Sequence, residues 1–169
     1  MQDFDYIVNA ARELVDLCQT RDPFKIAEEI GITVNFYDLG SLKGMYCIIK
    51  RNRMMAINSE LDEYMQRLVC AHELGHDILH RAIVRDALVR EFELYHTKNT
   101  TELEANLFCA ELLISDGDIT ELIERDYDLR QIAAALCVDE NLAAIKTEIL
   151  RRRGYHIRRA EFRSDFLKK

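Results

Sequence analysis

Residues 69–80, VCAHELGHDILH, contain two histidines and a glutamate at a spacing that can bind and use a metal ion. His72 and His76 are four residues apart, so on a helix their side chains lie about one turn apart and can reach one ion. Glu73 lies about 100° from His72 around the helix, where a carboxylate can hold and deprotonate a metal-activated water. Imidazole and carboxylate groups are usual ligands of catalytic zinc, so this HExxH pattern predicts a zinc site.

A chance pair of histidines on the exposed edge of an amphipathic helix is the alternative explanation. Most neighbours of the motif are apolar, namely Cys70, Ala71, Leu74, Ile78 and Leu79. Charged groups in such a helix cost free energy unless they are paired or bind a metal, which favours the metal site. Gly75, inside the motif, would allow a neighbouring segment to approach closely.

A third protein ligand is expected on the helix predicted for residues 101–114, which offers Glu102, Glu104 and Glu111. Glu104 has an alternative role, because with Thr101 as the N-cap it would be the glutamate of a capping box. That role would leave Glu104 exposed, whereas its neighbours are core-like, namely Leu103, Ala105, Leu107, Phe108 and Ala110. The residues therefore favour Glu104 as the third ligand, with Glu102 and Glu111 as the alternatives.

The stretch AHELGHDILH (71–80) is followed by TELEANLFCAELLI (101–114). Together they resemble the ImmA/IrrE family of metallopeptidases, whose patterns are HELGHxxLH and ExEANxFAxELL. The similarity covers most of residues 22–115. Cys109 stands where the family usually has alanine, and SDGD (115–118) follows the leucines where the family often has proline.

This resemblance implies a zinc-dependent peptidase in which His72 and His76 bind zinc, with Glu104 as the third ligand. Glu73 is then the general base. His80 and Glu111 also belong to the family pattern. His80 would lie about 12 Å along the helix from His72, too far to bind the same ion, so a supporting hydrogen bond is expected; Glu111 is expected to have a structural or supporting role. The family cleaves repressors that carry a DNA-binding helix-turn-helix. The implied substrate is such a repressor, whose cleavage at a specific site would release the genes of a mobile element or a stress regulon.

Hydrophobic periodicity and turn residues predict an α+β fold, with helices packed on a small, mostly antiparallel sheet. Helices are expected at residues 4–19, 24–30, 60–81, 101–114, 118–125 and 129–152, the last divided at CVDEN, and strands at 32–38, 45–50 and 54–57. Asp22 and Pro23 indicate an N-cap and a first helical residue, and Ser59 an N-cap for the motif helix. We expect residues 1–125 to form the metallopeptidase core and residues 126–169 a C-terminal helical segment with a basic tail, packed together as one unit.

The strand formed by Met54, Met55, Ala56 and Ile57 leads into the motif helix. A zinc peptidase must hold the scissile carbonyl beside the ion, which favours a substrate bound as an extended strand. This strand is therefore the candidate edge to which the substrate pairs. The alternative is a central strand that is already paired on both sides.

The formal charge of −7 is unevenly distributed, since residues 151–169 hold eight basic residues and two acidic ones. The acidic remainder argues against direct nucleic-acid binding and favours a basic protein partner. No apolar run approaches the roughly 20 residues that cross a bilayer, and the N-terminus lacks the pattern of a signal peptide. We therefore expect a cytoplasmic protein without membrane contact.

A non-enzymatic regulator is the competing function. Residues 129–150, LRQIAAALCVDENLAAIKTEIL, have the cadence of a helix-turn-helix, which together with the basic tail would make a DNA-binding module. A metal-bound protein that sequesters the repressor without cutting it is a further alternative.

Overall fold

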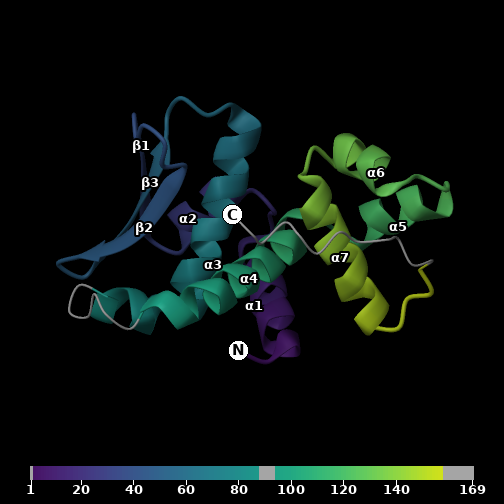
Figure 1. The fold of residues 1–169 in the computed structure, drawn as a ribbon, viewed down its shortest axis with the longest axis horizontal. Coiled ribbons are helices and arrows are strands. Elements are labelled where there is room, and N and C mark those ends of the chain that lie inside the picture. Colours follow the sequence, from purple (N-terminus) through teal and green to yellow (C-terminus); the bar gives the residue numbers. More distant parts are fainter. Residues whose placement is uncertain (1, 88–93, 158–169) are drawn as a thin grey trace.

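The computed structural model describes residues 2–87 and 94–157, which form seven helices and a three-stranded sheet (Figure 1). The elements are α1 (Phe4–Cys18), α2 (Pro23–Glu29), β1 (Ile32–Tyr37), β2 (Gly44–Ile49), β3 (Asn52–Asn58), α3 (Glu63–Ala87), α4 (Leu94–Leu113), α5 (Asp116–Glu124), α6 (Leu129–Leu136) and α7 (Glu140–Arg152). The sheet lies at one end of the molecule, α5 to α7 lie at the other, and α3 and α4 run between them. The expected α+β class is confirmed. Most of the expected basic tail, residues 158–169, lies outside the described residues.

Local sequence signals set several of these boundaries. The Asp22 carboxylate accepts a hydrogen bond from the Phe24 N–H and Pro23 is the first residue of α2, as expected. The division at CVDEN is also confirmed, because Asp139 is the N-cap of α7. Ser59 is not the N-cap of the motif helix: its N–H bonds to the Tyr37 carbonyl, and the Asp62 carboxylate accepts from the Met65 N–H at the start of α3.

The strand order is β1-β3-β2, so β3 is the central strand. It pairs antiparallel with β2, where Met55 faces Tyr46, and parallel with β1, where Met55 faces Val34. The sheet is therefore mixed, with the antiparallel pairing confined to the β2–β3 hairpin. The prediction that residues 54–57 form an open edge is wrong, because both sides of this strand are already hydrogen-bonded. The edges are β1 and β2.

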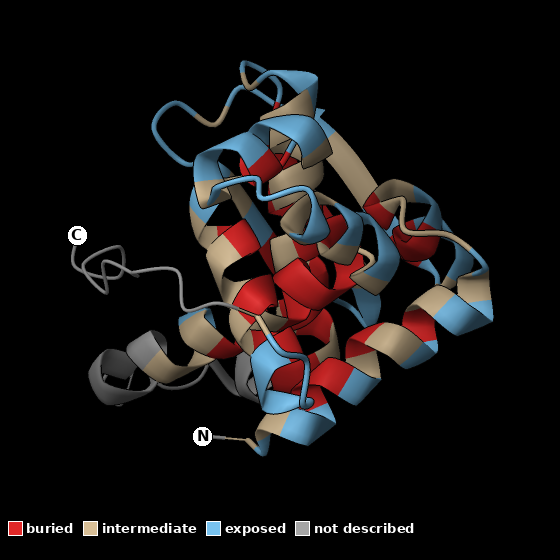
Figure 2. Ribbon diagram, turned by 90° about the vertical axis from the view of Figure 1, so that its right-hand side faces the viewer, coloured by how far each residue is buried: buried red, intermediate tan, exposed pale blue. Residues whose placement is uncertain are grey.

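The core lies where α3 and α4 pack against each other, against the sheet and against the terminal helices. Figure 2 shows the buried residues concentrated in the middle of the molecule. Side chains with less than 2% exposure come from α1, α2, β3, α3, α4, α5 and α7, and they include Ile7, Met55, Leu74, Phe108, Leu112 and Ile149. Each such side chain contributes about 1.5–3 kcal/mol through burial. None of the helices in the described part of the chain is long and apolar enough to cross a membrane.

A buried ion-pair network joins α7 to α4, α5 and α1. Lys146 is fully buried, and its Nζ lies 2.7 Å from Glu111 Oε2 and 2.6 Å from Asp116 Oδ1. Arg12 of α1 contacts both carboxylates, at 2.6 and 2.5 Å. Burial would raise the pKa of Asp116, but hydrogen bonds from Lys146 and Arg153 lower it below its ordinary range. The structure thus gives Glu111 a structural contact with Arg12 and Lys146.

Helices α3 and α4 approach each other closely at Gly75. A Cβ on Gly75 would lie 3.1 Å from Ala105 Cα, 3.3 Å from Ala105 Cβ and 3.3 Å from the Ala105 carbonyl oxygen. Few real Cβ atoms sit this close to a neighbour, so a side chain at Gly75 would require α4 to shift by a few tenths of an ångström. This confirms the close approach expected at Gly75.

We predict that Gly75→Ala lowers the free energy of unfolding by about 1–3 kcal/mol, because α3 and α4 must separate to accept the methyl group. The matched control is Gly117→Ala in α5, where an added Cβ meets nothing within 4 Å. That variant should be neutral or more stable by up to about 1 kcal/mol. Urea denaturation of both metal-free proteins measures the difference, and equal stabilities would contradict the prediction.

Candidate metal centre

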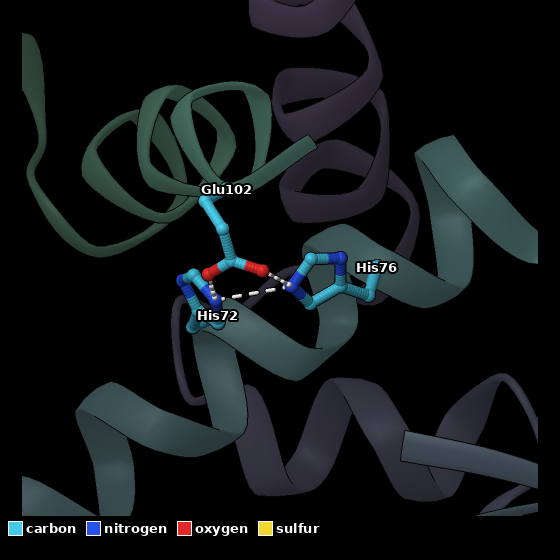
Figure 3. Close-up of side chains that lie close together, drawn as sticks. All are labelled: His72, His76 and Glu102. Atoms are coloured by element: carbon cyan, nitrogen blue, oxygen red, sulfur yellow. Dashed lines mark hydrogen bonds and ion pairs between the residues drawn. The ribbon is translucent and has the colours of Figure 1, made fainter. Parts of the chain in front are cut away.

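His72 and His76 of α3 converge on Glu102 of α4 (Figure 3). His72 Nε2 lies 3.2 Å from Glu102 Oε2, and His76 Nε2 lies 3.3 Å from Glu102 Oε1. The two Nε2 atoms are 3.1 Å apart. The histidine side chains are 21% and 15% exposed and that of Glu102 is 49% exposed, so the cluster opens to solvent on the Glu102 side.

The spacing of these three donor groups fits a zinc ion. Ligand atoms about 2.0–2.2 Å from zinc in a tetrahedral arrangement lie roughly 3.3–3.6 Å from one another. The observed separations of 3.1–3.3 Å come close to that range without any rearrangement. Two histidines and a glutamate leave a fourth position for water, which is the ligand count of catalytic zinc sites. The chemistry and geometry of this cluster therefore fit the metal predicted from the sequence.

Asn106 holds the His72 ring in the tautomer that a metal needs. Its Oδ1 lies 3.0 Å from His72 Nδ1 and, as an acceptor, requires the proton on Nδ1. The lone pair of His72 is then on Nε2, which faces Glu102. Sequence reasoning did not identify Asn106. Its signal was the Glu102-x-x-x-Asn106 spacing, which puts both side chains on one face of α4.

His76 is held by a chain of buried groups that leads away from the cluster. Its Nδ1 lies 3.2 Å from His80 Nδ1, and His80 Nε2 lies 2.8 Å from Glu104 Oε2. Because Glu104 accepts the His80 Nε2 proton, His80 Nδ1 can accept from His76 Nδ1, which leaves His76 Nε2 free for a metal. Glu104 Oε1 also accepts from the Gln2 main-chain N–H at 2.6 Å. The supporting hydrogen bond expected of His80 is therefore present.

The structure favours Glu102 over the predicted Glu104 as the third group of the cluster. Glu104 is 3% exposed and pairs with His80, whereas Glu102 faces the two histidines. Residues two apart on a helix lie about 200° apart, so Glu102 and Glu104 cannot face the same cluster. The capping-box alternative for Glu104 also fails, because α4 begins at Leu94 and Glu104 lies inside the helix. The apolar neighbours of Glu104 correctly indicated burial, but its partner is a histidine.

The groups of the cluster shift one another's pKa towards the charged forms of Glu102 and His72. Hydrogen bonds with His72 and His76 lower the pKa of Glu102 well below its usual range. Burial would lower the pKa of His72, but its hydrogen bond with Glu102 and the charges of Glu73 and Glu102 raise it overall. An ionised carboxylate that faces two imidazole nitrogens is a set of donors that a divalent cation can bind.

Glu73 lies beside the ligands and is oriented by β2. The Tyr46 main-chain N–H donates a hydrogen bond to its carboxylate. Burial raises the pKa of Glu73, although the neighbouring His72 and His76 partly oppose the rise. A carboxylate with a raised pKa beside a metal site is suited to accept a proton from water.

Asp77 of α3 joins this helix to the sheet through hydrogen bonds with β2 and β3. It is fully buried, and its carboxylate accepts from Tyr46 Oη at 2.5 Å, from Arg53 Nη1 at 2.9 Å and from Arg81 Nη2 at 2.8 Å. Tyr46 therefore joins β2 to α3 twice, through its side chain to Asp77 and through its main chain to Glu73. Sequence reasoning did not single out Asp77 or Tyr46, because their contacts join segments far apart in the chain.

A cavity of about 560 Å³ lies next to the cluster. His72, Glu73 and Glu102 line one part of it, Gly44 at the start of β2 another, and Leu142 and Ile145 of α7 a third. The cavity places the cluster within reach of a bound ligand. Its volume lies within the roughly 300–1,000 Å³ typical of ligand sites.

A family model described as the IrrE N-terminal-like domain, Peptidase_M78, matches residues 27–148. The chain belongs to this family. The matched region includes the whole sheet, the HExxH helix α3, the Glu102 helix α4 and most of α7. The resemblance to the ImmA/IrrE family drawn from the two motifs is therefore confirmed.

Two relatives of this Peptidase_M78 protein come from bacilli and their phages. "Uncharacterized immunity region protein 2" of Bacillus phage phi105 is 32% identical over 144 residues, which cover 85% of this chain and 90% of the relative. "Metallopeptidase ImmA" of Bacillus subtilis (strain 168) is 28% identical over 117 residues, which cover 68% of each chain. Both similarities are long enough to include more than the two motifs.

The structure predicts that Glu102, rather than Glu104, is required for metal binding. Glu102→Ala removes a group at the cluster and should lower zinc affinity more than Glu104→Ala, which keeps all three groups in place. Loss of the His80 acceptor in Glu104→Ala should weaken zinc binding by about 10–100-fold. Competition with a chromophoric chelator measures both affinities, and a larger loss in Glu104→Ala would restore Glu104 as the ligand.

Proposed function

We propose that the protein is a zinc-dependent endopeptidase that cleaves a helix-turn-helix transcriptional repressor at a specific site. The observation that carries this proposal is the convergence of His72, His76 and Glu102, with Glu73 beside them. Membership of a peptidase family supports the activity, and the relative named Metallopeptidase ImmA supports a metal-dependent one. The phage relative is named for an immunity region, which supports a regulatory protein of a mobile element as the substrate.

Each residue of the site would have a separate role in peptide-bond hydrolysis. When bound, zinc would acidify a water molecule and polarise the scissile carbonyl. His72, His76 and Glu102 would hold it. Glu73 would accept the proton of the attacking water and return it to the leaving amine, as a general base and then a general acid. The Tyr46 N–H would keep the Glu73 carboxylate turned towards the ligands.

The substrate would bind along β2, the edge strand next to the cluster. The Lys43 carbonyl accepts from the Asn58 N–H, so the alternation of an antiparallel pair turns the main-chain groups of residues 45, 47 and 49 towards β3. Those of Gly44, Tyr46 and Ile48 then face away from β3. The Tyr46 N–H, which reaches Glu73, agrees with this assignment. An extended substrate could pair with the remaining outward groups.

The charge of the protein suits a repressor as substrate. The formal net charge is −7, and the acidic part precedes residue 151. DNA-binding proteins carry basic surfaces, so attraction between opposite charges would speed their encounter with this protein. A repressor substrate also places the enzyme in the cytoplasm.

The structure offers no support for a DNA-binding role of α6 and α7. In a helix-turn-helix the second helix presents its residues to the major groove. Here α7 instead buries a large part of its surface, including Leu142, Ala143, Lys146, Thr147, Ile149 and Leu150. A protein that only sequesters the repressor is separated from a peptidase by turnover: co-expression with a repressor encoded beside it, followed by mass spectrometry, would reveal fragments only if it is cut.

We predict that Glu73→Gln retains zinc and loses about 10²–10⁴-fold of the cleavage rate, because it removes the proton acceptor and leaves the three ligands in place. His72→Ala should lose both zinc and activity. Metal content by mass spectrometry and the rate of repressor cleavage are measured together. If Glu73→Gln loses zinc in parallel with activity, Glu73 is a ligand and its proposed role is wrong.

We also predict that Ile48→Pro slows cleavage more than Ile48→Ala does. Proline removes an N–H that faces away from β3, so the hydrogen bonds between β2 and β3 are kept. Edge strands such as β2 also tolerate proline. The alanine variant removes the same side chain and keeps the donor. Circular dichroism and zinc content confirm that both variants fold. Equal cleavage rates for the two variants would exclude substrate pairing at Ile48.

A further inference from the structure

The cavity beside the cluster contains an apolar recess between α3 and α7. Its lining includes Met65, Leu68 and Val69 of α3, Leu142 and Ile145 of α7, and Leu42 of the loop before β2. Val69 and Leu142 are 7% and 5% exposed, and Met65, Leu68 and Ile145 are partly buried. Leu68, Val69, Leu142 and Ile145 thus belong to the packed interior, while Leu42 is 48% exposed and lies at the open side of the recess.

Two polar groups of the cavity already have hydrogen-bond partners. Asp139, which lines the same cavity, already accepts hydrogen bonds from the Asn141 N–H at 2.9 Å and from Asn141 Nδ2 at 2.7 Å. Asn106 is bonded to His72. A charge moved from water into the apolar part would lose its hydration without a dedicated partner, which is unfavourable. The recess selects for apolar groups.

We propose that this recess is a specificity subsite, which binds one large apolar side chain of the substrate next to the scissile bond. The inference rests on the proposed peptidase function and names the residue type that the enzyme selects. His72, Glu73 and the recess line one cavity, so a side chain bound there belongs to a residue adjoining the bond held at the cluster.

The lining also assigns a role to the C-terminal segment. Leu142 and Ile145 come from α7, and Lys146 holds this helix against Glu111 and Asp116 in the ion-pair network. A site on α3 and β2 alone would lack this wall. Helix α7 therefore takes part in choosing the substrate.

The test uses the metal-free protein and three small probes: the amides of N-acetyl-leucine, N-acetyl-alanine and N-acetyl-lysine. Binding is followed by nuclear magnetic resonance of labelled methyl groups. The leucine probe should shift the methyl signals of Leu68, Val69 and Ile145, and should bind at least about tenfold more tightly than the other two. Equal binding of the probes, no binding of the leucine probe, or shifts confined to another surface would overturn the subsite.

A matched pair of variants separates the recess from general stability. Ile145→Asn places a polar group in the recess and should weaken binding of the leucine probe at least about tenfold. Ile123 of α5 is also a partly buried isoleucine packed on the core, but it does not line the cavity, so Ile123→Asn should bind like the native protein. Should Ile145→Asn fail to fold, Leu68→Ala removes apolar contact from α3 with the same expected direction. Unchanged binding in the folded recess variant would refute the proposal.

Cleavage by the zinc-loaded protein distinguishes this inference from the function on which it rests. A leucine probe bound in the recess of a protein that cuts no repressor would support the recess and refute the peptidase. Glu73-dependent cuts with no large apolar residue on either side of the bond would support the peptidase and overturn the subsite.

Discussion

The close crossing of α3 and α4 at Gly75 and Ala105 is the contact on which the metal centre depends. With no side chain on Gly75, α4 comes near enough for an added Cβ to lie 3.1 Å from Ala105 Cα. Glu102 and Asn106 lie three residues before and one residue after Ala105, so the face of α4 that makes the crossing also carries both polar groups towards α3. Glu102 thereby reaches both histidines, and Asn106 reaches His72.

The histidines themselves are held by hydrogen bonds on their far sides. Asn106 accepts a hydrogen bond from His72. His76 is hydrogen-bonded to His80, which in turn donates to the buried Glu104. A buried carboxylate and imidazole would each cost free energy alone, and their mutual hydrogen bond offsets this cost. Both imidazoles are thereby held with their Nε2 atoms facing Glu102. On the sheet side, the Tyr46 N–H holds the Glu73 carboxylate, and the Tyr46 hydroxyl is itself held by Asp77.

The C-terminal helices are tied to this centre by charge as well as by apolar packing. Removing one partner from a buried ion pair typically costs about 3–5 kcal/mol, so the contacts of Lys146 with Glu111 and Asp116 hold α7 firmly in place. The same helix contributes Leu142 and Ile145 to the cavity beside the cluster. Under the proposed function, α7 would therefore serve both stability and substrate selection.

The sequence by itself determined the features that one element contains. His72, Glu73 and His76 could be predicted as one group because the geometry of a single helix relates them, and Asp22 and Pro23 marked a helix start because capping is local. Only the tertiary structure decided which glutamate joins the histidines and which strand is an edge. The choice between Glu102 and Glu104 depends on how α4 is rotated against α3, and the central place of Met55 depends on the order in which distant strands pair. Both outcomes arise from packing between segments far apart in the chain, and neither changes the local pattern of residues.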